Sequence, residues 1–440
     1  MAGGSIRHEP RARERAAPAR RHGGPGPRRV VVTGLGVCSS VGSGVGKFWD
    51  ALVSGRSGIG PITLFDAAAL RSRIAGEVLD FDPEAKLDSK TIKRSARFTQ
   101  LALVAAFEAL DQAALPSGER ENTAVIVGSG IGGFDMLEHE HSEFLERGPG
   151  KFAPLTVPMI IPNMAAGMIA IETGCRGANL CISTACAAGA HSIGTAFDLI
   201  RTRRADIALA GAAESTISPF AVDGYCQLRA LSTRNEEPEK ASRPFSADRD
   251  GFVIAEGAGL MVLESLAGAR ARGVQPLAEV AGYGITADGY HQTAPDPRRQ
   301  GAIRAMRAAL EDAGIVPEDV DLINAHGTST PLNDAAETRS IKDVFGAHAY
   351  RIPVQATKSM TGHSLGASAA IEAVASVLAI RDGVIHPTVN LDVPDPECDL
   401  DYVSHTARRA RVRCVMSNAF GFGGHNGVLI FRALADGKGA

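Results

Sequence analysis

Residues 181–190, CISTACAAGA, join a segment with the pattern of a strand to a segment with the pattern of a helix. Residues 178–184 (ANLCIST) predict a strand, and residues 187–202 predict a helix with Ile193 and Phe197 on one face. Cys186 therefore lies at a sharp strand-to-helix junction among small residues. The positive end of a helix dipole stabilises a thiolate, so this position is typical of a nucleophile.

A metal site is a second interpretation of Cys181 and Cys186, but the pair needs further cysteine or histidine ligands, and only His191 is near in sequence. His139 and His141 form another histidine pair, and on a predicted amphipathic helix their side chains point apart. We therefore expect no metal. A small cysteine buried among alanines remains a third interpretation.

The composition is that of a globular protein, with 45% hydrophobic and 22% charged residues in a chain of 440. A net charge of −3 gives no electrostatic reason to expect nucleic acid or membrane binding. The seven cysteines are an odd number, spread singly, with no secretory signal before them. We therefore expect a reduced, cytoplasmic protein without disulfides. The longest apolar run, residues 365–380, carries Glu372 and predicts a buried helix, not a membrane span.

Alternating strand and helix patterns predict an α/β fold with buried sheets. A weak internal repeat is also present: a helix followed by a strand and a glycine-bearing loop occurs near residues 108–130 and again near residues 308–327. This order suggests a duplicated architecture with a site between two halves. We expect a disordered Arg/Pro/Gly-rich extension over 1–28, halves over 29–270 and 271–433, and a tail over 434–440.

Two later stretches contain residues that can assist a nucleophile. NAHGTSTPLND (324–334) places His326 directly after a predicted strand, and TKSMTGHSLGA (357–367) places Lys358 and His363 in a loop of small residues. A histidine in such a loop can donate a hydrogen bond to a thioester carbonyl or accept a proton near neutral pH.

Two glycine-rich stretches have different interpretations. In NAFGFGGHNG (418–427), glycines allow backbone N–H groups to face a developing oxyanion, and Phe420 and Phe422 can line an acyl channel. GSGIGG (128–133) has the spacing of a dinucleotide site but lacks the second strand and acidic residue that such a site requires. We expect it to be a tight turn packed against another backbone segment.

Together, the motifs TACAAG, NAHGTSTPLND, KSMTGHSLGA and NAFGFGGHNG resemble those of the β-ketoacyl-[acyl carrier protein] synthases. The resemblance covers about residues 29–433 and includes VVVTGLGVCSSVG and SADRDGFVIAEGAG. It is closest to the elongating type and to the ketosynthase subunits of type II polyketide systems, because two histidines are present where the initiating branch has His and Asn. It implies a thiolase-like fold, in which two duplicated halves form α-β-α-β-α layers.

The resemblance also implies roles for individual residues. Cys186 matches the acylated nucleophile, His326 and His363 match the decarboxylating pair, and Lys358 and Glu372 match supporting residues behind them. The N–H groups of Cys186 and Phe422 match the oxyanion hole, and Phe422 also matches a gate. The residues that match substrate contacts, in the pantetheine passage and the acyl pocket, are Thr293, Thr328, Thr330, Ile131, Tyr225 and Phe420. The family usually has phenylalanine where this chain has Tyr225.

The function implied by the resemblance is decarboxylative Claisen condensation of an acyl thioester with malonyl-[acyl carrier protein], in fatty acid or polyketide elongation. The alternatives are a non-catalytic subunit of a polyketide heterodimer, which would lack the nucleophile, and a cysteine acyl hydrolase. No cofactor is implied beyond the phosphopantetheine of the carrier. The implied partners are acyl carrier protein and a second ketosynthase-like chain, identical or a sister subunit. The residues that match the basic carrier-docking patch are Lys90, Lys93, Arg94, Lys151 and Arg229.

Overall fold

The computed structural model describes residues 27–434, and its main feature is one mixed sheet that runs through both halves of the chain. The strands of the first half, in spatial order, are β1 (Val30–Ser39), β8 (Gly257–Ser265), β7 (Ile207–Glu214), β5 (Ala124–Gly128) and β6 (Asn179–Leu180). Those of the second half are β9 (Ala278–Ala287), β15 (His425–Arg432), β14 (Cys414–Gly421), β10 (Leu322–Asn324) and β11 (Val354–Gln355). Both sets are given from the centre of the sheet outward. At the centre β1 and β9 pair antiparallel, with Val30 opposite Val280, and this pairing joins the two halves.

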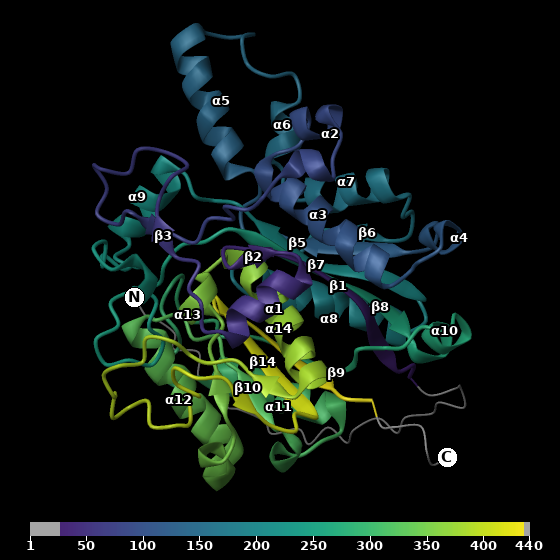
Figure 1. Ribbon diagram of the computed structural model, residues 1–440, viewed down its shortest axis with the longest axis vertical. Coiled ribbons are helices and arrows are strands. Elements are labelled where there is room, and N and C mark those ends of the chain that lie inside the picture. The colour runs from purple at the N-terminus through teal and green to yellow at the C-terminus, as the bar shows by residue number, and fades with distance from the viewer. Residues whose placement is uncertain (1–26, 435–440) are drawn as a thin grey trace, which may run out of the picture.

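Helices cover these strands in three layers (Figure 1). α3 (Arg97–Gln112) and α7 (Met164–Thr173) cover the first half, and α11 (Gln300–Ala313) and α12 (Pro331–Phe345) cover the second. Between them lie α8 (Ala188–Arg201) and α14 (Ser368–Asp382), which contact strands of both halves. This arrangement confirms the predicted α/β fold with α-β-α-β-α layers.

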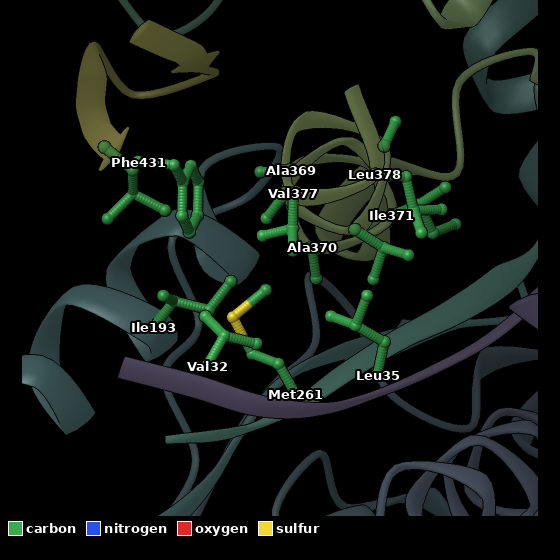
Figure 2. Packing of buried hydrophobic residues seen from close by; sticks show 14 of the residues in the cluster. Val32, Leu35, Ile193, Met261, Ala369, Ala370, Ile371, Val377, Leu378 and Phe431 are labelled. Carbon is green, nitrogen blue, oxygen red and sulfur yellow. The ribbon is translucent and has the colours of Figure 1, made fainter. Parts of the chain in front are cut away.

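The central layer contains the main hydrophobic core. Figure 2 shows Ala370 and Ile371 of α14 facing Leu35 of β1 and Met261 of β8, with Phe431 of β15 on another side of the same helix. All are buried. Because α14 is buried on nearly every side, its sequence is mainly apolar, with Glu372 as a buried charged exception, and shows little amphipathic periodicity. Both halves therefore share one core.

The two helices of the predicted internal repeat pack in the same way on matching glycines. In β1, a Cβ atom on Gly36 would lie 1.9 Å from the carbonyl oxygen of Ala105 in α3. In β9, a Cβ atom on Gly284 would lie 2.0 Å from the carbonyl oxygen of Ala305 in α11. The helices of the predicted repeat, α3 and α11, thus each pack closely on a glycine-bearing strand that precedes them, and the strands that follow them are β5 and β10.

Smaller elements connect these layers. The remaining helices are α1 (Val45–Val53), α2 (Ser89–Lys93), α4 (Ser117–Arg120), α5 (Phe134–Arg147), α6 (Thr156–Ile160), α9 (Pro219–Gln227), α10 (Leu266–Ala271) and α13 (Lys358–Thr361). Short strands are β2 (Gly42–Ser43), β3 (Gly60–Pro61), β4 (Ile74–Ala75), β12 (Val384–Ile385) and β13 (Arg408–Arg409). α5 projects from the body of the molecule (Figure 1).

The strand predicted over 178–184 is wrong beyond its first residues. Only Asn179–Leu180 pair with β5, after which the chain leaves the sheet toward Cys186. The limits 29–270 and 271–433 remain a prediction, and the connection between the halves runs through α10. The predicted disordered extension lies outside the described residues except for residues 27 and 28, and the tail does so except for Leu434.

The glycine pair generates a stability prediction. Gly36→Ala and Gly284→Ala each force a Cβ atom into a helix backbone, so each should lower the free energy of unfolding by about 1–3 kcal/mol or more. Urea denaturation of the purified chain measures this loss. Gly46→Ala in α1 is the control, because its Cβ would meet nothing within 4 Å, and it should be neutral or stabilising by up to ~1 kcal/mol. Equal stability of all three variants would contradict this packing account.

Candidate active site

The loop before α8 presents Cys186 at a sharp turn. Ala185 has φ of 48°, a left-handed conformation that costs a non-glycine residue about 1–2 kcal/mol. α8 begins two residues after Cys186, at Ala188, as the sequence predicts. The Cys186 Sγ is buried and lies 3.1 Å from the Nε2 of His363. A strained turn therefore fixes a thiol beside an imidazole.

The protonation of Cys186 reflects opposing effects. Burial raises the pKa of the thiol to about 11, while Lys358 and the backbone N–H groups of Phe422 and Cys186 itself act to lower it. The cost of desolvating the thiolate is thus larger than the stabilisation expected from the helix dipole, and the Cys186 thiol is protonated in the resting site. Attack by Cys186 therefore needs a proton acceptor, and the His363 Nε2 is within reach.

Lys358 connects the second histidine to a buried carboxylate. Its Nζ lies 2.6 Å from Glu372 Oε1, 2.7 Å from the backbone oxygen of His326 and 3.3 Å from the Nδ1 of His326. An ammonium group only donates hydrogen bonds, so the Nδ1 accepts and the proton of a neutral His326 is on Nε2. The Lys358–Glu372 pair thereby leaves the Nε2–H of His326 as the hydrogen-bond donor of a ring that lines the cavity.

Both histidines are neutral at pH 7. Burial lowers the pKa of His326 and of His363 well below the usual value, and Lys358 lowers both further. The two rings are 5.6 Å apart between centroids. The Nδ1 of His363 lies 2.8 Å from the Oγ of Ser368, which holds that ring in place. Two neutral imidazoles at one point of the cavity can donate hydrogen bonds to the same developing oxyanion.

The glycine-rich loop after β14 packs directly on the nucleophile. A Cβ atom on Gly421 would lie 2.9 Å from the Thr184 oxygen and 3.2 Å from the Cys186 nitrogen. Only glycine permits this approach, which lets the Phe422 N–H face the sulfur. The expected oxyanion-hole groups, the N–H groups of Cys186 and Phe422, therefore lie together.

A cavity of about 450 Å³ opens onto Cys186, His326 and His363. The predicted gate Phe422 lines it, and so do all the predicted substrate contacts: Ile131, Tyr225, Thr293, Thr328, Thr330 and Phe420. Lys358 and Glu372 do not line it and lie buried behind the histidines. Distant segments of the sequence therefore meet around one sulfur atom.

Glu337 was not singled out from the sequence, although it also lines the cavity. Its carboxylate accepts hydrogen bonds from the N–H groups of His326 at 2.8 Å and Gly327 at 2.9 Å, and from the Nδ2 of Asn418 at 3.1 Å. Burial raises its pKa. The signal available in the sequence was two acidic residues, Asp334 and Glu337, on the buried face of a helix.

His191 also has a role that the sequence did not suggest. Its Nδ1 lies 2.8 Å from the Oγ1 of Thr184, and its Nε2 lies 3.3 Å from the backbone oxygen of Asn426. The imidazole thus links the nucleophile loop to the strand after the glycine-rich loop. It is a positioning residue and not a metal ligand with Cys181.

The GSGIGG stretch is a tight turn, as expected. Glu214 at the end of β7 accepts hydrogen bonds from the Gly130 N–H at 2.6 Å, the Ser129 hydroxyl at 2.9 Å and the Gly366 N–H at 3.1 Å. A Cβ atom on Gly366 would lie 2.3 Å from the nitrogen of Gly130. The turn therefore packs on the segment before α14 and forms one wall of the cavity.

The other histidine pair and the basic residues lie at the surface. His139 and His141 are exposed on α5. Within residues 27–434, no group of three or more His, Cys, Asp or Glu side chains could hold a metal ion. The predicted docking residues Lys90, Lys93, Arg94, Lys151 and Arg229 are all exposed, and of these Arg229 also lines the cavity. No helix in the described part of the chain is long and apolar enough to span a membrane.

Comparison with known proteins agrees with this geometry. Sequence profiles of the β-ketoacyl synthase N-terminal domain and C-terminal domain match residues 27–269 and 277–392. The chain belongs to the β-ketoacyl synthase family. Among curated relatives of this β-ketoacyl synthase are 3-oxoacyl-[acyl-carrier-protein] synthase 2 of Synechocystis sp., 49% identical, and that of Coxiella burnetii, 48% identical. The alignments cover 92% and 93% of this chain and 98% and 99% of those relatives.

Solved structures of similar ketosynthases include "The ishigamide ketosynthase/chain length factor", with 40% identity and a TM-score of 0.88. Another is a type II polyketide ketosynthase in complex with its acyl-carrier protein, with 36% identity and a TM-score of 0.86. Each covers 93% of this β-ketoacyl synthase and 100% of the solved chain. The resemblance to elongating and polyketide ketosynthases is therefore confirmed.

Substitutions in the Lys358–Glu372 pair should distinguish its effect on the stability of the fold from its effect on the tautomer of His326. Lys358→Met leaves the Glu372 carboxylate buried without its partner and should lower the free energy of unfolding by about 3–5 kcal/mol. Lys358→Met with Glu372→Met removes both charges and should recover that loss. In both variants the His326 Nδ1 loses its donor, so ¹⁵N NMR of labelled histidine should show loss of the fixed Nε2–H tautomer. A double variant that keeps this tautomer would contradict the assignment.

Proposed function

We propose that this chain is a 3-oxoacyl-[acyl carrier protein] synthase, an acyltransferase that elongates an acyl chain by decarboxylative Claisen condensation with malonyl-[acyl carrier protein]. The observation that carries the proposal is the buried Cys186 Sγ at 3.1 Å from the His363 Nε2, with His326 on the same cavity. The names of the curated relatives support it, since the chain covers nearly their whole length.

In the first step, the Cys186 sulfur attacks the acyl thioester on the carrier. The carrier's carbon–sulfur bond breaks, a bond from the acyl carbon to the Cys186 Sγ forms, and the released pantetheine sulfur takes up the proton that Cys186 gives away. The N–H groups of Cys186 and Phe422 stabilise the oxyanion of the tetrahedral intermediate. The covalent intermediate divides one difficult reaction into two easier ones.

In the second step, malonyl-carrier loses CO₂. The electron pair of the broken carbon–carbon bond moves onto the thioester, which becomes an enolate. His326 and His363, both neutral, donate hydrogen bonds to the enolate oxygen as a pair. For this step the proton of His363 is on Nε2, and the Ser368 hydroxyl donates to its Nδ1, whereas acceptance of the Cys186 proton in the first step requires the other tautomer. Lys358 and Glu337 act through His326 and position it.

In the third step, the enolate carbon attacks the carbonyl carbon of the acyl-Cys186 thioester. A carbon–carbon bond forms and the bond to Sγ breaks. The departing sulfur takes up one proton from solvent through His363, which is the proton that the overall reaction consumes. The product is 3-oxoacyl-carrier. Burial of Cys186 and of both histidines excludes water, which would otherwise hydrolyse the acyl-enzyme.

The remaining cavity residues contact the substrates. Thr328 and Thr330, whose hydroxyl oxygens lie 3.0 Å apart, and Thr293 bind the pantetheine arm. Phe422 acts as a gate between this passage and the nucleophile. Three residues form the acyl pocket: Ile131, Tyr225 and Phe420. No cofactor acts beyond the carrier's phosphopantetheine.

The partners in this proposal are an acyl carrier protein and a second ketosynthase-like chain. The carrier is acidic and docks on the exposed basic patch of Lys90, Lys93, Arg94, Lys151 and Arg229. The similar polyketide ketosynthase was solved with its acyl-carrier protein. Free cysteines throughout the described chain support a cytoplasmic setting.

A second candidate function is elongation in a type II polyketide pathway, with a sister subunit as the partner chain. The solved polyketide ketosynthases favour this pathway, whereas the curated relatives favour fatty acid synthesis. The intact Cys186 argues against the non-catalytic subunit. The fold limits 29–270 and 271–433 are proposed as the two duplicated halves.

Exposed apolar side chains beside an edge strand support the dimer. β6 ends the sheet, and its Leu180 is 45% exposed. Ile171 on the neighbouring helix α7 is 69% exposed, and Val157 on α6 is 67% exposed. Pairing of two β6 strands across a two-fold axis would continue the sheet and cover these side chains.

The catalytic proposal predicts a covalent adduct. Incubation with acyl-carrier should add the mass of the acyl group to Cys186, and malonyl-carrier should then yield 3-oxoacyl-carrier, both detected by mass spectrometry. Cys186→Gln should give neither adduct nor product. Cys226→Ser, which changes another buried cysteine outside the cavity lining, is the control and should keep both. Absence of an adduct with every acyl group would contradict the nucleophile assignment.

The dimer proposal predicts the effect of charge at the edge strand. Ile171→Asp together with Leu180→Asp should shift the protein from dimer to monomer in sedimentation velocity experiments, because two carboxylates would be buried in the interface. Val316→Asp, at a 55% exposed position after α11, is the matched control and should leave the dimer intact. A wild-type monomer, or a dimer that survives both substitutions, would rule out this interface.

A further inference from the structure

One polar group lies in the apolar part of the cavity without a partner. Tyr225, on α9, packs in a cluster of apolar residues with its ring edge-on to Phe252, at 5.6 Å between centroids. Its hydroxyl makes no hydrogen bond within the described chain, and it is not among the fully enclosed polar atoms. Because Tyr225 lines the cavity, this hydroxyl is available to a ligand.

The phenol lies close to the reaction centre. Phe252 contacts the Tyr225 ring on one side and the His363 ring on the other, at 5.2 Å between centroids. After burial, the proximity of Cys186 and Glu214 is the next cause that raises the pKa of Tyr225. An acyl chain bound to the Cys186 Sγ therefore shares this cavity with Tyr225.

Among residues 27–434, no acceptor forms a hydrogen bond with this hydroxyl. Burial raises the pKa of Tyr225, so the phenol keeps its proton and acts as a donor. The Glu214 carboxylate already accepts hydrogen bonds from Ser129, Gly130 and Gly366. The neighbouring cavity residues Ile131 and Leu365 are apolar.

We propose that Tyr225 selects acyl chains that carry a hydroxyl or keto oxygen, by donating a hydrogen bond to that oxygen. A saturated chain displaces water from the phenol and leaves the donor unpaired, whereas an oxygenated chain replaces the lost hydrogen bond. The inference rests on the proposed acylation of Cys186 and names the class of acyl substrate for that site.

The test measures acylation of Cys186 by intact-protein mass spectrometry with N-acetylcysteamine thioesters of equal length. The panel is hexanoyl, trans-2-hexenoyl, 3-hydroxyhexanoyl and 5-oxohexanoyl. The full-length wild-type chain should react with at least one oxygenated thioester about tenfold faster than with the hexanoyl thioester. In Tyr225→Phe this ratio should fall to about 1 and the hexanoyl rate should rise, because the buried donor is gone.

Tyr350→Phe is the matched control, since it removes a phenolic oxygen from a surface tyrosine outside the cavity. It should keep the wild-type ratio. Equal rates for all thioesters, a preference for hexanoyl or hexenoyl, or an unchanged ratio in Tyr225→Phe would overturn the inference while leaving Cys186 acylation intact. Absence of any Cys186 adduct would overturn the proposed function and this inference with it.

Discussion

The packing of α8 and α14 between the two halves of the sheet is the constraint on which the site depends. α8 positions Cys186, which belongs to the first half, while His326 and His363 belong to the second. Since both helices contact strands of both halves, the thiol and the His363 imidazole meet at 3.1 Å. Neither half contains the complete site, so catalysis requires the shared core.

Buried charge is the second requirement of this architecture. Lys358 and Glu372 form an ion pair away from solvent, and Glu214 and Glu337 accept hydrogen bonds from backbone N–H groups of the loops around the cavity. Each carboxylate is costly to bury and is compensated by specific donors. These groups fix the orientation of loops that contain many glycines, so rigidity comes from polar contacts as much as from apolar packing.

The sequence predicted the layers and the meeting of distant motifs, because the motifs of a known family carry that information. It also indicated the duplication, which rests on the paired approach of Gly36 and Gly284 to alanine-rich helices. It did not indicate Glu337 or His191, whose roles arise from three-dimensional contacts with backbone atoms. The protonation of Cys186 was also missed, because desolvation depends on what surrounds a residue and not on its neighbours in the chain. The roles of the site residues and of the basic patch remain predictions.

A single-turnover experiment tests the central claim most directly. Enzyme already acylated on Cys186 is mixed with malonyl-carrier labelled with ¹³C in its free carboxyl group, and ¹³CO₂ release is followed together with loss of the acyl adduct. The account predicts that one equivalent of ¹³CO₂ appears for each adduct lost, with formation of 3-oxoacyl-carrier. Loss of the adduct as free acid without ¹³CO₂ release would contradict it and would identify an acyl hydrolase.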